Sequence, residues 1–79
     1  MLDDTTQKLI TEFRNHPEVR TVAFICNYWE REDGIEYSYR LTLFRAGNKN
    51  KLESEEHRGE LTHDGLRNLF SRGLEKLIA

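Results

Sequence analysis

The chain has little of the features that define several common protein classes. It contains one cysteine in 79 residues, so no internal disulfide can form and a reducing, cytoplasmic location is expected. Its longest apolar run, Val22 to Cys26, is far shorter than the roughly 20 residues of a membrane span. The acidic N-terminus Met1-Leu2-Asp3-Asp4 lacks the basic charge of a signal peptide. With no repeat, linker or low-complexity segment, residues 1–79 are predicted to form one soluble domain.

An excess of positive charge is also missing. The chain has 12 basic and 14 acidic side chains and a net charge of −2, which gives no overall electrostatic argument for a nucleic-acid partner. Carboxylates gather in one segment, which predicts an acidic surface for a basic partner: Glu53, Glu55, Glu56 and Glu60. A basic loop supports the alternative function, a weak nucleic-acid contact with Tyr28 or Trp29 stacking on bases: Arg45, Lys49 and Lys51.

No pattern in the chain indicates catalysis or a bound metal. Cys26 falls on the expected core face of a hairpin and has no neighbouring base, so it is interpreted as a small core residue. The histidines show no metal-ligand spacing with it: His16, His57 and His63. Carboxylate pairs such as Glu55-Glu56 are typical of solvated surface, and the glycines form no phosphate-binding loop. We therefore predict neither an enzyme nor a metal or cofactor site.

The clearest structural signal is a long antiparallel hairpin from Val19 to Arg45. Asp33-Gly34 is a strong hairpin-turn signal, because a type I′ turn needs positive φ at both central residues. With these as the two loop residues, one face collects apolar pairs: Tyr28–Tyr39, Cys26–Leu41, Phe24–Leu43 and Val22–Arg45. The other face carries Ala23–Phe44, Ile25–Thr42, Asn27–Arg40, Trp29–Ser38 and an Arg31–Glu36 ion pair.

Amphipathic helices flank the hairpin. The first is capped by Asp3 or Asp4, buries Thr6, Leu9, Ile10 and Phe13, and ends at His16-Pro17. The last has Thr62 as its N-cap and buries one stripe of side chains: Leu66, Leu69, Phe70, Leu74, Leu77 and Ile78. Gly73 lies on this stripe, where it allows another backbone to approach closely.

The segment between the hairpin and the last helix leaves the strand count open. Residues 52–60 are polar, and a charged edge strand has this composition. The predicted fold is an α+β two-layer sandwich of order α-β-β-(β)-α, with both helices on one face of a two- or three-stranded sheet. A two-stranded sheet would need a second copy of the chain to complete it.

This order resembles the α-β-β-β-α layout of the double-stranded RNA binding domain. That resemblance implies a phosphate-binding first loop and a lysine-rich start to the last helix. Here these places read Glu30-Arg31-Glu32-Asp33-Gly34 and Thr62-His63-Asp64-Gly65. Acidic groups stand where phosphates would bind, so we assign no family.

The outer face of the hairpin is the predicted binding surface. It combines aromatic, aliphatic and arginine side chains in the mixture favoured at binding hot spots: Trp29, Arg40, Ile25, Phe44, Asn27 and Arg31. We expect a small protein-binding module, an adaptor, regulator or inhibitor-type accessory protein of the kind common in bacteria and phages. Its expected partner is another protein or a second copy forming a homodimer, with Trp29 as anchor.

Overall fold

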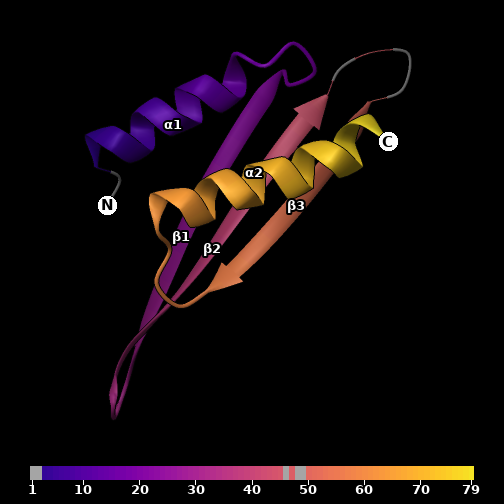
Figure 1. The fold of residues 1–79 in the computed structure, drawn as a ribbon. Coiled ribbons are helices and arrows are strands. Elements are labelled where there is room, and N and C mark those ends of the chain that lie inside the picture. The colour runs from indigo at the N-terminus through magenta and orange to yellow at the C-terminus, as the bar shows by residue number, and fades with distance from the viewer. Residues whose placement is uncertain (1–2, 46, 48–49) are drawn as a thin grey trace.

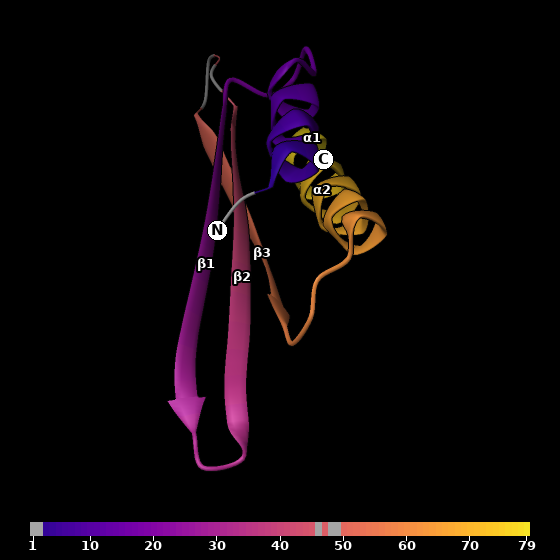
Figure 2. The same ribbon diagram turned by 90° about the vertical axis from the view of Figure 1, so that its left-hand side faces the viewer.

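A computed structural model describes residues 3–45, 47 and 50–79, in the order α1-β1-β2-β3-α2 (Figure 1). The strands form one antiparallel sheet with β2 in the centre. Both helices lie on the same face of this sheet, which gives two layers (Figure 2). The predicted α+β fold class is confirmed. The open question of the third strand is also answered, because β3 (Lys51–Arg58) pairs along β2.

The hairpin turn differs from the predicted one. β1 (Thr21–Arg31) and β2 (Gly34–Arg45) are joined by Glu32 and Asp33, not by Asp33 and Gly34. Neither loop residue has a positive φ, and Gly34 takes the positive value of 140° as the first residue of β2. The prediction of a type I′ turn was therefore wrong, because that turn needs a positive φ at both loop residues. Here the positive φ is at Gly34, the residue that follows the loop.

The new turn shifts the strand register by two residues. Tyr28 lies opposite Tyr37 rather than Tyr39, and the predicted pairing was wrong throughout. Each side chain stays on its predicted face, since a shift of two preserves the alternation of a strand. Arg31 and Glu36 still form an ion pair, with Nε and Oε2 2.5 Å apart, although they are now diagonal rather than opposite.

Both helices begin at the predicted N-caps. Before α1 (Asp4–Arg14), Asp3 Oδ1 accepts a hydrogen bond from the Thr6 amide at 2.7 Å. Before α2 (His63–Ile78), the Thr62 hydroxyl accepts from an amide of the first turn at 3.0 Å. These side chains satisfy amides that have no partner inside the helix.

The core lies between the two helices and the part of the sheet farthest from the hairpin turn. Its buried members are mostly leucines: Leu9, Phe13, Val19, Leu41, Leu43, Leu66, Leu69 and Leu77. The rings of Phe13 and Phe70 stack with centroids 4.2 Å apart, which joins α1 to α2. An ideal Cβ on Gly73 would stand 3.1 Å from Leu43 Cδ1, so the predicted approach of a backbone was wrong and a side chain of β2 packs there instead. Ile78, predicted to be buried, is about half exposed.

The helices cover only part of the hairpin. In Figures 1 and 2 the strands run well past both helices and end in a narrow ribbon at the turn. The molecule is accordingly elongated, with extents of 48 × 23 × 16 Å. Cys26, predicted to be in the core, is exposed because its part of the hairpin's helix-side face has no helix packed over it. In the described part of the chain, no helix has both the length and the apolar character needed to cross a membrane.

Candidate protein-interaction surface

The projecting end of the hairpin, residues 28–37, is named here the hairpin arm. β3 pairs only with residues 38–45 of β2, so the arm is a two-stranded ribbon. On its helix side, Tyr28 is 68% exposed, Ile35 52% and Tyr37 36%. Tyr28 and Tyr37 face each other across the strands with ring centroids 6.5 Å apart, and Tyr37 stacks on Tyr39 at 6.4 Å. The arm therefore presents a row of aromatic rings to solvent.

Acidic side chains outnumber basic ones in the arm. The arm carries four acidic side chains, Glu30, Glu32, Asp33 and Glu36, against the single guanidinium of Arg31. Its net charge is −3, so the field around the aromatic rings repels phosphate and attracts cationic groups.

The outer face of the arm holds the predicted anchor, Trp29. This side chain is half-buried, and the Arg31 guanidinium lies 6.0 Å from its ring centroid, within cation–π range. Asn27 and Ile25 follow on the same face, with Ile25 46% exposed. Arg40 lies opposite Ile25, and its Nη2 is 2.8 Å from an oxygen of Glu56 on β3.

The six predicted partner-binding residues share one face but do not form one cluster. Phe44 pairs with Thr21 at the far end of the hairpin, eight residues along β1 from Trp29. At about 3.3 Å per residue this separation is about 26 Å. Phe44 instead lies beside Leu52 of β3, which is exposed. A single partner side chain cannot contact both aromatic residues.

The predicted acidic surface is divided between the two faces of the sheet. Glu55 lies on the helix side, where its carboxylate is 3.2 Å from Lys76 Nζ and 3.7 Å from Arg72 Nε. Glu53 shares that side, whereas Glu56 lies on the outer face with Arg40. Glu60 follows β3, and its backbone carbonyl accepts a hydrogen bond from His57 Nε2 at 2.9 Å. These four residues therefore do not share one face of the sheet.

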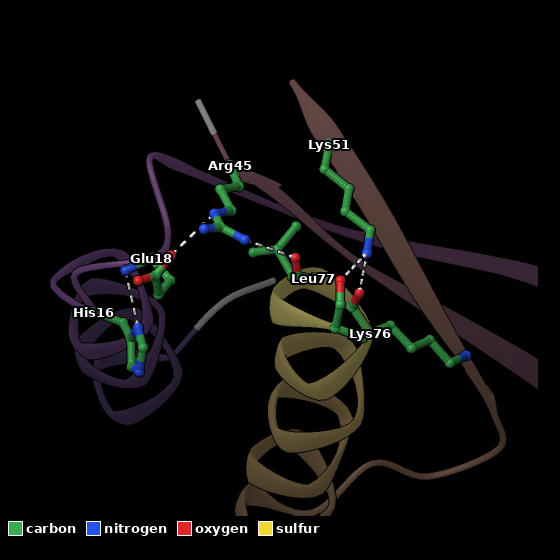
Figure 3. Close-up of polar contacts among 7 residues, drawn as sticks. His16, Glu18, Arg45, Lys51, Lys76 and Leu77 are labelled. Carbon is green, nitrogen blue, oxygen red and sulfur yellow. Dashed lines mark hydrogen bonds and ion pairs between the residues drawn. The ribbon is translucent and has the colours of Figure 1, made fainter. Parts of the chain in front are cut away.

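Of the three basic residues predicted to contact nucleic acid, Arg45 and Lys51 donate hydrogen bonds to the C-terminal end of α2 (Figure 3). Lys51 Nζ donates to the backbone oxygens of Lys76 at 2.5 Å and Ala79 at 3.2 Å. Arg45 donates to the Leu77 carbonyl at 3.4 Å and pairs with Glu18 at 2.9 Å. Carbonyls at a helix C-terminus lack partners within the helix, so these cations satisfy them. Lys49, the third basic residue, lies outside the described residues.

A pocket of about 670 Å³ lies where the arm meets the helices. Its walls are the starts of both helices, including Asp3 and His63, whose Oδ1 and Nε2 are 3.7 Å apart. Phe24, Cys26 and Tyr39 line it from the sheet. Burial raises the pKa of the Tyr39 hydroxyl, and the adjacent Cys26 thiol raises it further. The sheet side of this lining is apolar or aromatic, whereas the helix starts contribute polar groups.

The exposed helix side of the arm, where Ile35 and Tyr37 join Tyr28, was not predicted from the sequence. The apolar face of the hairpin was expected to form core along its whole length. The element lengths contained a signal, since an 11-residue strand spans about 36 Å whereas a 16-residue helix spans about 24 Å. Helices of this length that cross the strands obliquely leave one end of the hairpin uncovered.

Within the described ranges, no group of three or more His, Cys, Asp or Glu side chains is placed to hold a metal ion. The exposed arm and the adjoining pocket are thus the surfaces on which a function can be argued. Comparisons with protein-family models, with curated proteins and with solved structures found no match for this chain.

Proposed function

We propose that this protein is a protein-binding module that engages its partner through the hairpin arm. The observation that carries the proposal is the exposure of Tyr28, Ile35 and Tyr37 on a two-stranded ribbon that extends beyond β3 and both helices. Tyrosine supplies a large contact area at a small cost in conformational entropy, and it is enriched at binding hot spots. A partner can bury this row of side chains without displacing any contact of the core.

The charge of the arm defines the chemistry of the partner. With a net charge of −3 around its aromatic rings, the arm is complementary to an apolar groove with a basic rim. The outer face adds Trp29 at the same end of the molecule, so the ribbon offers apolar contacts on both sides. An adaptor, regulator or inhibitor that inserts the arm into such a groove is the function this geometry supports best. The expectation that the protein is not an enzyme stays a prediction.

The alternative of nucleic-acid binding finds no support in the described contacts. Lys51 and Arg45 are occupied at the end of α2, and the exposed rings of the arm stand among carboxylates. Phosphate groups would have to approach the arm against its own charge. A filter-binding assay on single-stranded DNA and RNA tests this alternative, and salt-sensitive retention by the arm would overturn the choice.

Site-specific photo-crosslinking tests the proposed function. A photoreactive phenylalanine analogue replaces Tyr37 in one variant and Glu75, exposed on α2, in a matched control. In lysate of the cells that produce the protein, we expect a discrete protein adduct from position 37 and none from position 75. Excess unlabelled wild type should abolish the adduct, whereas excess Tyr28→Ala protein should compete poorly. Equal adducts from both positions, or full competition by Tyr28→Ala, would contradict the proposal.

Self-association remains a separate expectation for the outer face. Light scattering across a dilution series measures it directly, with Trp29→Ala as the test variant. We expect the variant to stay folded and to dissociate at higher concentration than the wild type. An unchanged mass profile would remove Trp29 as the anchor of a homodimer.

A further inference from the structure

The two edges of the sheet differ in their protection against added strands. β3 forms one edge and carries five charged residues among eight. β1 forms the other edge, and the nine residues from Thr21 to Trp29 contain no charge and no proline. An edge strand has backbone N–H and C=O groups that no neighbour uses, and charge or proline commonly prevents unwanted pairing. Between Thr21 and Trp29, β1 has neither kind of protection.

The helix layer extends beyond this unprotected edge. In Figure 1 the N-terminal ends of α1 and α2 lie outside β1, on the side away from β2, and Figure 2 views the molecule from that side. The 670 Å³ pocket lies beneath these helix starts, with Phe24 and Cys26 contributed by β1 itself. Side chains of a strand added to β1 would point alternately into the helix layer and away from it. Beside β1 the fold thus leaves a pocket, apolar and aromatic on its sheet side, into which side chains of an added strand would point.

A second copy of the chain does not suit this edge. Two β1 strands paired antiparallel are related by a two-fold axis perpendicular to the sheet, so both copies would place their helices on the same side. The helix starts of both copies extend past β1 and would meet above the seam (Figure 1). An extended segment that brings no helix layer of its own avoids this conflict.

Charged side chains at the two ends of the edge restrict the sequence of such a segment. Glu30 is exposed on the helix side near one end of β1, and Arg20 is exposed immediately before the other end. Neither forms an ion pair within the part of the chain that the structure describes. A bound strand with a basic residue near Glu30 and an acidic residue near Arg20 complements both.

We infer that an extended segment of a partner protein adds to the free edge of β1 as a fourth strand, placing an apolar side chain in the pocket beside Cys26 and a basic side chain near Glu30. The inference deepens the proposed protein-binding function, on which it rests. Backbone hydrogen bonds along β1 hold the segment, and the pocket selects its sequence.

A random-peptide library displayed on phage supplies the probe. Cys26→Phe fills the pocket from within, and Ala23→Phe adds the same ring on the opposite face of β1, at an exposed position outside the predicted binding residues, as a matched control. Circular dichroism checks that both variants fold. Peptides selected on wild type, made synthetically, should bind Cys26→Phe at least about tenfold more weakly, equivalent to about 1.4 kcal/mol, and bind Ala23→Phe as they bind wild type. Failure to select any peptide, or equal binding to both variants, would overturn the inference.

Two further measurements separate this inference from the proposed function. Bound peptide should slow hydrogen exchange of β1 amides, and Glu30→Lys should weaken binding of the basic peptides while Glu75→Lys, exposed on α2, should not. If Tyr37→Ala abolishes peptide binding but β1 amides exchange as before, the arm binds proteins without strand addition and only the inference fails. If neither the arm nor the edge responds, both proposals fail. A dimer whose β1 amides are protected without peptide would assign the edge to a second copy and overturn the inference.

Discussion

The two halves of the hairpin have the same alternation of side chains, but the apolar face is buried in one half and exposed in the other. In the covered half, Leu41 and Leu43 are fully buried beneath the helices. In the arm, Tyr28 and Tyr37 continue the same face of the same strands and remain exposed. Alternation therefore defines a face, and only a second layer of structure converts that face into core.

Stability should be distributed accordingly. Fully burying a leucine side chain contributes about 1.5–3 kcal/mol, whereas an exposed cross-strand pair contributes about 0.2–1 kcal/mol. The arm can thus change with little effect on folding, which leaves its side chains available for binding. The following predictions test this division, beginning with the largest effect.

Removing a buried side chain from the covered half should have the largest effect. Leu43→Ala leaves a cavity beneath α2, and we expect a loss of about 2–5 kcal/mol in the free energy of unfolding. Tyr28→Ala on the same face of the arm should lose less than about 1 kcal/mol. Urea denaturation followed by circular dichroism measures both. Similar losses from the two variants would show that the arm belongs to the core after all.

Adding volume where the helix meets the covered half should have a smaller effect. Gly73→Val brings a branched side chain against Leu43, since even a Cβ there is 3.1 Å from Leu43 Cδ1. We expect a destabilisation of about 1–3 kcal/mol from overpacking. Ser71→Val is the matched control, because it places the same residue on the exposed side of α2. Because valine forms helices better than glycine, an unchanged or raised melting temperature of Gly73→Val would show that Leu43 moves aside without cost.

The smallest effect should appear at the start of α1 and depend on pH. Hydrogen bonds from Thr6 hold the pKa of the Asp3 carboxyl below its ordinary value of 3.8. Because the folded-state pKa is the lower one, the stabilising contribution is present above pH 3.8 and is lost as the pH falls through the folded-state pKa. Asp3→Asn keeps a capping side chain without this titration. Thermal melts of the two proteins should therefore converge below pH 3.8, and a constant difference would contradict the assignment.

The sequence determined much of the local structure of the covered half. Capping by Asp3 and Thr62 was predictable because an N-cap satisfies amides within its own first turn. The buried stripes of both helices were equally predictable from their 3.6-residue period. Ile78 is an exception, since its burial depends on how far the sheet extends beneath the last turn.

The candidate site was less accessible to sequence reasoning. Trp29 and Arg31 lie together at the arm as predicted for one face, but Phe44 on that face is about 26 Å away. Arg45 and Lys51, predicted to form a free basic surface, meet the end of α2 instead. Such contacts join residues far apart in the chain, so composition along a segment carries no information about them.

The sequence by itself determined that two helices and a hairpin form, where the helices begin and which side chains share a strand face, because capping and periodicity act over a few neighbouring residues. Only the tertiary structure decided the hairpin register, since a shift of two residues leaves every face unchanged. It also decided how much of the hairpin becomes core. That depends on where the two helices dock and how far they reach, and their reach leaves Tyr28 and Tyr37 exposed.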